Sequence, residues 1–173
     1  MSCRLFEEEE HTRKYRLHRP NYPKQLFEHI INYYFNVIGV DVSVNQIAHA
    51  MQKDNIEYRC NKAEDLTFLE SNSVDIITVA TSLHWLNLEV FVEEVKRVLK
   101  PNISVFAIWT YGFVRRWLTD RYYQSLLLLL LYKSTLVEYT IEQTIKTSIG
   151  QYIDLIETYS ACQMYRKQKF EQA

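Results

Sequence analysis

Short apolar runs alternate with amphipathic stretches through the middle of the chain. The runs at 36–41, 56–59, 75–80 and 105–109 have the length and composition of strands buried in a parallel sheet. A helix is predicted after Ser43, a residue type that caps helices, with an apolar face formed by Val44, Ile47, Ala48 and Met51. Residues 36–59 are therefore expected to form a β-α-β unit.

A second amphipathic helix is predicted from Asn87 to Leu99, before Pro101. Its inward positions, which recur at helical spacing, are Leu88, Phe91, Val92, Val95 and Val98. Strands that alternate with helices in this way form a parallel sheet with helices on both faces. The fold class is therefore expected to be α/β.

The ends of the chain follow a different pattern. Residues 15–23, YRLHRPNYP, read as an ordered, proline-containing arm, and Pro23 suits the first turn of a helix that runs to about Tyr34. After Gly112 the pattern is mostly helical: helices are predicted over 114–139 and 148–167, with a short strand near 139–145. The chain has 173 residues and no repeat or linker, so residues 1–173 are expected to form one domain.

Charge and cysteine content exclude several kinds of partner. The net charge is -1 and the pI is about 6.5, so the chain has no basic field to hold nucleic acid. Cys3, Cys60 and Cys162 fit neither a disulfide framework nor a CxxC metal site. The acidic run at 7–10 stands where a signal peptide or presequence would begin, which favours a cytoplasmic location.

Leu126–Leu131 is the most apolar block, but charged residues bracket it at Arg121 and Lys133. Spanning a bilayer takes about 20 apolar residues, so no membrane partner is expected. A buried helix is the favoured interpretation. The alternative is that these leucines dock a protein partner.

Polar side chains appear where the strand at 75–80 ends. Thr81, His84 and Trp85 follow it and are suited to gripping a small molecule. In parallel α/β sheets, ligands lie at the carboxyl ends of strands. The run therefore predicts a ligand site at this end of the sheet.

Asp41 ends another strand, two residues after Gly39. From this position a carboxylate can accept hydrogen bonds from both hydroxyls of a ribose. Asp41 can equally serve to help Ser43 cap the next helix, and the residue alone does not decide between the two roles.

Two further groups have both a functional and a structural interpretation. Ala63, Glu64 and Asp65 follow the strand at 56–59, where a loop could cover an adenine ring or simply turn. His84 and Trp85 could face a reacting group or pack in the core. Three successive strand ends would point at one crevice, which favours the functional interpretation.

The order and spacing of these segments resemble class I S-adenosylmethionine-dependent methyltransferases, within them the type 11 group similar to trans-aconitate methyltransferases. The matching segments cover most of the chain: YRLHRPNYP at 15–23, VIGVDVSVNQIAHAM at 37–51, NIEYRCNKAEDLTFLESNSVDIITVATSLHWL at 55–86, EVKRVLKPN at 94–102, FAIWTYG at 106–112 and TYSACQMY at 158–165.

The resemblance implies a Rossmann-like fold, S-adenosylmethionine as cofactor and a small-molecule acceptor. Asp41 would bind the adenosyl ribose, and the other cofactor contacts would be Tyr15, Arg19, Ala63, Glu64, Ala80 and Thr81. His84 and Trp85 would face the acceptor. His84 would act as a base where the acceptor must lose a proton, because methyl transfer otherwise needs mainly alignment and exclusion of water.

One segment of the family pattern is missing from this chain. The family has a strand, a glycine-rich D-x-G-x-G loop and a helix where only residues 32–36 stand here, and the three glycines are too far apart to form that loop. The sheet is therefore expected to be a truncated Rossmann-like sheet. Either residues 37–41 pair directly with 75–80, or residues 31–35 supply a substitute edge.

Three functions follow from these observations. The first is methyl transfer to a small molecule, with a carboxylate as the suggested acceptor and with weak or absent cofactor affinity because the glycine loop is missing. The second is a non-catalytic shortened isoform or pseudoenzyme that acts through protein interaction. A nucleotide-binding module of another kind ranks last, because the chain has no GxxxxGK or GxGxxG motif.

Overall fold

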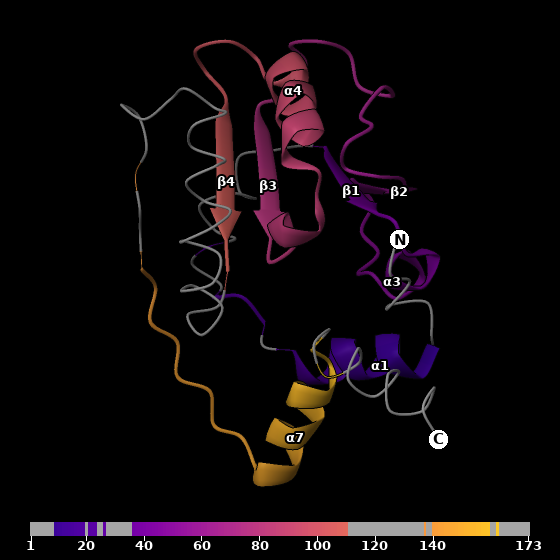
Figure 1. Cartoon of the computed structure of the whole chain (residues 1–173), viewed down its shortest axis with the longest axis vertical. Coiled ribbons are helices and arrows are strands. Elements are labelled where there is room, and N and C mark those ends of the chain that lie inside the picture. Colours follow the sequence, from indigo (N-terminus) through magenta and orange to yellow (C-terminus); the bar gives the residue numbers. More distant parts are fainter. Residues whose placement is uncertain are drawn as a thin grey trace. The chain divides into compact units, whose positions relative to one another are not determined.

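The computed structural model describes residues 9–19, 21–23, 26, 36–110, 137, 140–159 and 162. Contacts between Cα atoms divide the chain into two compact units (Figure 1). The first unit contains residues 1–60 and 140–173, and the second contains residues 61–139. We describe each unit by itself.

The β-α-β unit predicted from the sequence is confirmed in the first unit. Strands β1 (Val37–Asp41) and β2 (Ile56–Cys60) pair in parallel, with Val37 opposite Ile56 and Asp41 opposite Cys60. Helix α3 (Val44–Ala48) connects them, and the Ser43 hydroxyl caps it by accepting a hydrogen bond from the Gln46 N–H at 3.2 Å.

Helix α3 is shorter and more exposed than its sequence pattern predicts. Val44 is 67% exposed, and Met51, at 65% exposure, lies beyond the end of the helix. The expected inward face of this helix is therefore wrong at both ends. A helix of five residues has little propensity-based stability of its own, so its cap and its neighbouring strands hold it.

Gly39 is required by the side chain opposite it. It pairs with Tyr58 across the ladder, and a Cβ atom at position 39 would lie 2.7 Å from the Tyr58 ring. The Tyr58 hydroxyl donates to the Met51 carbonyl at 2.8 Å, which holds the ring in place. The glycine thus makes room for a tyrosine that closes one face of β1.

Two helices from opposite ends of the chain complete the first unit. Helix α1 (Glu9–His18) includes the first part of the expected arm, so Tyr15–His18 are helical. Helix α7 (Ile149–Glu157) begins with a capping box, in which Ser148 and Gln151 each bond the other's backbone N–H. Lys14 of α1 donates to Glu157 of α7 at 3.0 Å.

Two predictions about the last third of the chain have different outcomes. Helix α7 confirms the beginning of the helix expected from Ser148; most of the remainder lies outside the described residues. The strand near 139–145 is wrong for the residues that the structure describes, because 140–148 contain no strand. The predicted helices over 23–34 and 114–139, with Leu126–Leu131, fall largely outside the described part of the chain.

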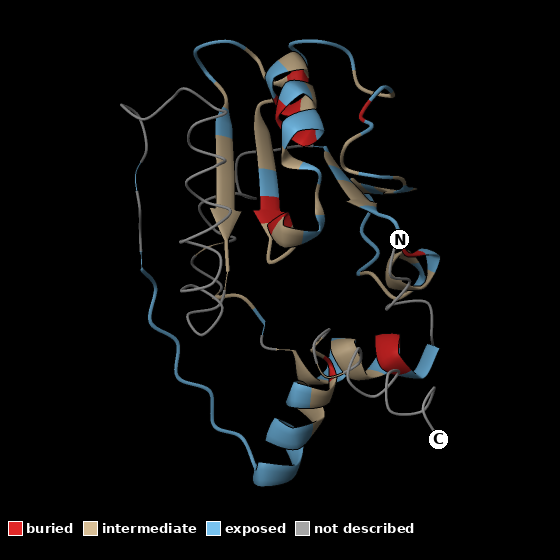
Figure 2. Cartoon of the chain, viewed as in Figure 1, coloured by how far each residue is buried: buried red, intermediate tan, exposed pale blue. Residues whose placement is uncertain are grey.

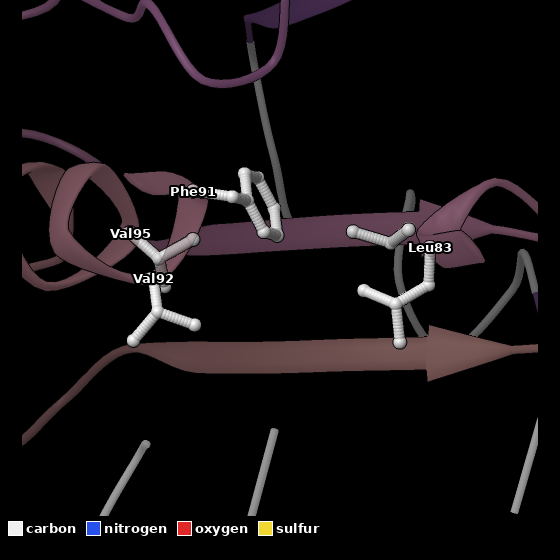
Figure 3. Close-up of a cluster of buried hydrophobic side chains, with 5 residues drawn as sticks. Leu83, Phe91, Val92 and Val95 are labelled. Carbon is white, nitrogen blue, oxygen red and sulfur yellow. The ribbon is translucent and has the colours of Figure 1, made fainter. Parts of the chain in front are cut away.

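The second unit is built on strands β3 (Ile76–Ala80) and β4 (Val105–Trp109), which pair in parallel with Ala80 opposite Trp109. Helix α4 (Leu88–Val98) connects them, as the apolar periodicity predicted. Its inward side chains pack with the strand and the turn that follows it, in a cluster of Val79, Leu83, Phe91, Val92 and Val95 (Figure 3). Figure 2 shows the buried positions gathered along α4.

Arg97 fixes the loop that precedes β3. Its guanidinium donates to the carbonyl oxygens of Leu66 at 2.8 Å and Leu69 at 2.9 Å, and it forms two hydrogen bonds with Glu94. Glu94 also accepts a hydrogen bond from the Leu66 N–H at 2.8 Å. Helix α4 therefore determines the path of the loop.

The described strands form two parallel two-stranded ladders, β1–β2 and β3–β4. The predicted pairing of residues 37–41 with 75–80 would join strands of different units and stays a prediction. The alternative edge at 31–35 lies outside the described residues. The α/β class with parallel pairing and connecting helices is confirmed.

None of the helices in the described part of the chain has the length and apolar character needed to cross a membrane.

Candidate functional site

Asp41 lies at the carboxyl end of β1, as the sequence predicted. Its Oδ1 atom accepts a hydrogen bond from the Ser43 N–H at 2.8 Å, while the residue remains exposed. Partial burial of the carboxyl raises its pKa above the ordinary value, and the backbone N–H groups of Ser43 and Val42 act in the opposite direction. Asp41 therefore helps to start α3 and still presents a carboxylate to solvent.

Tyr15 and Arg19 belong to the same unit as Asp41. The Arg19 guanidinium carbon lies 4.7 Å from the Tyr15 ring centroid and 4.4 Å from that of Tyr159, so the cation is held between two aromatic rings. Arg19 also donates from Nη2 to the carbonyl oxygen of Thr158 at 3.2 Å. The sequence prediction assigned no role to Thr158 or Tyr159, although both lie in the segment TYSACQMY that carries part of the resemblance.

Tyr15 also connects this group electrostatically to Asp41. Burial raises the pKa of Tyr15, the Arg19 cation partly lowers it, and the charges of Tyr22 and Asp41 add to the rise. Of the residues expected to hold the cofactor, Tyr15 and Arg19 are in contact, and Asp41 belongs to the same unit.

The remaining expected residues lie in the second unit, and two of them sit where β3 ends. Ala80 is the last residue of the strand, and the Thr81 N–H donates to the Trp109 carbonyl at 3.0 Å. Thr81 has a φ of 53°, in the left-handed region that a β-branched residue rarely occupies. Strained backbone of this kind concentrates at functional sites, so the conformation points to a role for this turn.

His84 and Trp85 form part of a single 3-10 turn, η1 (Leu83–Trp85). Their ring centroids lie 4.9 Å apart with a tilt of 42°. Leu83 is buried in the core, while Trp85 is 45% exposed. Leu83 therefore anchors the turn, and Trp85 does not have the burial that the core-packing interpretation requires.

Ala63 and Glu64 lie in a turn after β2. Ala63 packs against the hydrophobic cluster. The Glu64 Oε1 atom accepts a hydrogen bond from the N–H of Asn87 at 2.7 Å, at the start of α4. A carboxylate at a helix N-terminus is stabilised by the helix dipole, so this side chain has a structural task in addition to any contact with a ligand.

Trp109 is a further candidate that the sequence prediction did not single out. It ends β4 directly beside Ala80 in the ladder and is half-buried. The sequence contained a signal for this residue. Trp109 and Thr110 stand at the end of an apolar strand, just as His84 and Trp85 stand after the end of β3.

The donor set fits the adenosine end of the expected cofactor. Asp41 provides an exposed carboxylate that can accept hydrogen bonds from hydroxyl groups, and the aromatic rings of Tyr15 and Tyr159 accompany it in the first unit. Among the described residues, no cluster of histidine, cysteine or carboxylate side chains could hold a metal ion.

Comparison with known proteins finds similarity to methyltransferases. Residues 23–107 match the family model of the type 11 methyltransferase domain. A protein of Dictyostelium discoideum named as a methyltransferase is 48% identical over 86 residues, which are 50% of this chain and 32% of that protein. One of Saccharomyces cerevisiae named as an S-adenosylmethionine-dependent methyltransferase is 33% identical over 87 residues, 46% of this chain and 29% of its own length.

A similar fold is found in a solved structure from Anaeromyxobacter dehalogenans, named as a type II methyltransferase. It has a TM-score of 0.57 and 24% identity, and the match covers 87% of this chain and 82% of that one. This likeness confirms the Rossmann-like α/β fold. The chain spans about a third of the length of the curated relatives that it matches. Residues 23–107 thus resemble the methyltransferase domain of S-adenosylmethionine-dependent methyltransferases.

Proposed function

We propose that this chain binds S-adenosylmethionine and transfers its methyl group to a small molecule, with a carboxylate as the acceptor class. The observation that carries the proposal is the exposed Asp41 carboxylate at the end of β1, in the same unit as Tyr15 and Arg19 and within a segment that matches the methyltransferase family. In this proposal Asp41 accepts hydrogen bonds from the ribose hydroxyls.

The remaining contacts in this proposal are those that the family resemblance implies. Ala63 and Glu64 flank the adenine, and Ala80 and Thr81 lie beside the methionine moiety. Because the Glu64 Oε1 atom already accepts from the Asn87 N–H, its contact with the adenine is made through Oε2 or the backbone.

His84 and Trp85 face the acceptor in this proposal. When a carboxylate oxygen attacks the methyl carbon, a C–O bond forms, the S–CH₃ bond breaks and the electron pair returns to sulfur. A carboxylate acceptor carries no proton at this oxygen, so no base is needed for this step. The task of His84 is then to orient the acceptor, and it becomes a base only for an acceptor that must lose a proton.

The affinity for the cofactor is proposed to be low, because the glycine-rich loop that holds the amino-acid end in the family is missing from the sequence. The acceptor class comes from the resemblance to trans-aconitate methyltransferases. The location proposed for this activity is the cytoplasm, which the cysteine content favours.

Calorimetry on the full chain tests cofactor binding, with S-adenosylmethionine and S-adenosylhomocysteine as separate ligands. Saturable binding of either supports the proposal. Transfer of a tritiated methyl group to trans-aconitate, or to another small carboxylic acid in a panel, then tests the acceptor class. If neither ligand binds at millimolar concentration, the catalytic proposal is wrong.

The second candidate is a non-catalytic protein, and one observation favours it. The Tyr58 ring lies against Gly39, so a glycine that could let a ligand approach β1 is covered by the chain's own side chain. The partner surface expected at Leu126–Leu131 lies outside the described residues and stays a prediction. Failure of both ligands to bind, with the chain folded, supports this candidate.

A further inference from the structure

The α1–α7 contact contains a cation held on three sides. Arg19 follows α1, and its guanidinium lies between the rings of Tyr15 and Tyr159. Both centroid distances are within the roughly 6 Å over which a cation is attracted to an aromatic face. Its Nη2 atom also donates to the carbonyl oxygen of Thr158, at the C-cap of α7, where unsatisfied carbonyl oxygens favour positive charge.

The α7 side of this contact is rigidly held. Thr158 is fully buried, and its hydroxyl donates to the Leu155 carbonyl at 2.6 Å. Thr12 of α1 is fully buried as well. Lys14 and Glu157 add a half-buried ion pair at 3.0 Å to the same contact. Burial at Thr12 and Thr158 therefore fixes the position of the Thr158 carbonyl and of Tyr159.

We propose that Tyr159 is a positioning residue for the cofactor site: it holds Arg19 against Tyr15, and so fixes the position of the Tyr15 ring. This inference rests on the proposed function for its ligand. Tyr159 lies after α7, well outside the segment 23–107 that matches the family model. The C-terminal part of the chain thereby helps to position Tyr15 and Arg19.

The response of Tyr15 to Asp41 supplies a readout that needs no ligand. Because the charge of Asp41 raises the pKa of Tyr15, Asp41→Asn should lower that pKa in the full-length protein. With ¹³C-labelled tyrosine, the Cζ resonance of Tyr15 reports its titration. The same change is then repeated in the Tyr159→Leu and Tyr159→Phe backgrounds.

We expect Tyr159→Phe to keep the response, since a phenyl ring still faces the cation, and Tyr159→Leu to diminish it. An Asp41→Asn response in Tyr159→Leu equal to that in the wild type would overturn the inference. Arg19→Met, which keeps both rings and removes the cation, serves if Tyr159→Leu does not fold, and it should diminish the response in the same way.

Ligand binding gives the second readout. We expect Tyr159→Leu to weaken S-adenosylhomocysteine binding by roughly 2- to 30-fold, the range for loss of one cation–π contact, with Tyr159→Phe close to wild type. Tyr152→Leu is the matched control, because Tyr152 lies on α7, shortly before Tyr159, and is 54% exposed. Equal weakening by both leucine variants contradicts the inference, whereas absence of binding in the wild type counts against the proposed function and leaves the Tyr15 titration to decide.

Discussion

The Oδ1 atom of Asp41 and the backbone N–H of Ser43 lie 2.8 Å apart in a hydrogen bond. The Ser43 hydroxyl in turn accepts from the Gln46 N–H at 3.2 Å. The carboxylate thus stabilises the start of α3 through one oxygen. The two roles that the sequence left open for Asp41 are therefore compatible, because one oxygen can cap while the other meets a ligand.

Asp41→Asn should separate these two roles. Asparagine keeps an oxygen that can accept from the Ser43 N–H, but it loses the charge that strengthens bonds to ribose hydroxyls. Charged hydrogen bonds contribute roughly 1.5 to 3 kcal/mol, so we expect S-adenosylhomocysteine to bind about 10- to 100-fold more weakly in calorimetry. Asp54→Asn, an exposed change in the turn before β2, should leave the affinity unaltered.

The same variant should change how stability depends on pH. The pKa of Asp41 is raised in the folded chain. The contribution of Asp41 to the free energy of unfolding is therefore fully present below its unfolded pKa of about 3.9, and it is lost as pH rises through its folded pKa. Asp41→Asn removes the titrating carboxyl and therefore this loss of stability with rising pH. Relative to the variant, the wild type should become less stable between acidic and neutral pH in urea unfolding; the opposite trend would show that the carboxyl is stabilised in its charged form.

Glu94 should show the reverse dependence. Hydrogen bonding from Arg97 and from the Leu66 N–H holds the pKa of Glu94 below its usual range, against the effect of burial. Its contribution is therefore present above its unfolded pKa, about 4.3, and is lost as pH falls through the folded value. We expect Glu94→Gln to lower the free energy of unfolding by about 1 kcal/mol at neutral pH, with a smaller difference in acid.

Glu93→Gln is the control for this measurement. Glu93 has the same side chain and a 2.9 Å ion pair with Lys96, but its side chain is 73% exposed. Exposed pairs of this kind typically contribute less than about 1 kcal/mol, so we expect a change within about 0.5 kcal/mol and little pH dependence. Equal losses in both variants would mean that the bonds from Arg97 and Leu66 are not the cause.

Thr81 gives a test of backbone strain. A threonine at a φ of 53° costs roughly 1 to 3 kcal/mol relative to a relaxed conformation, whereas asparagine tolerates this region well. We expect Thr81→Asn to raise the free energy of unfolding by about 1 kcal/mol. Asn102 has a φ of 67°, so the reciprocal change Asn102→Thr should lower it by a similar amount. Unchanged stability in both variants would show that the surroundings do not enforce these conformations.

Phe91 and Val90 are adjacent residues with very different surroundings. Phe91 is 2% exposed within the α4 cluster, and Val90 is 47% exposed on the same helix. Phe91→Ala should lower the free energy of unfolding by about 3 to 5 kcal/mol because it leaves a cavity, while Val90→Ala should stay within about 0.5 kcal/mol. Denaturant unfolding followed by circular dichroism distinguishes them, and similar losses at both positions would contradict the packing of α4.

Apolar periodicity was sufficient to predict the elements of the second unit. The strand Val105–Trp109 and the inward face of α4 follow directly from their apolar positions and from the Pro101–Asn102 boundary. Helix α1 was not predicted because EEHTRKYRLH has no apolar stripe; its contacts with α7 hold it. The prediction of a strand near 139–145 was wrong for the opposite reason. Residues with strand propensity form a strand only where another strand can pair with them.

Site residues whose contacts are close in sequence could be predicted, whereas those with contacts far apart in sequence could not. The position of Asp41 follows from the strand that ends there, and its bond to Ser43 spans only two residues. The contact between Arg19 and Thr158 spans 139 residues, and no spacing rule within the chain indicates it. For the same reason, the pattern could place β1 and β3 as strands without revealing that each pairs with a different neighbour.

The first unit is assembled from both ends of the chain, with residues 61–139 inserted between its two parts. During synthesis, Lys14 leaves the ribosome 143 residues before Glu157, its ion-pair partner on α7. The second unit lies wholly within one stretch and can begin to fold earlier, because domains generally fold as their residues emerge. Helix α1 can make its contacts with α7 only after α7 has been synthesised. A translational pause or truncation before residue 149 would therefore leave Arg19 without Thr158 and Tyr159.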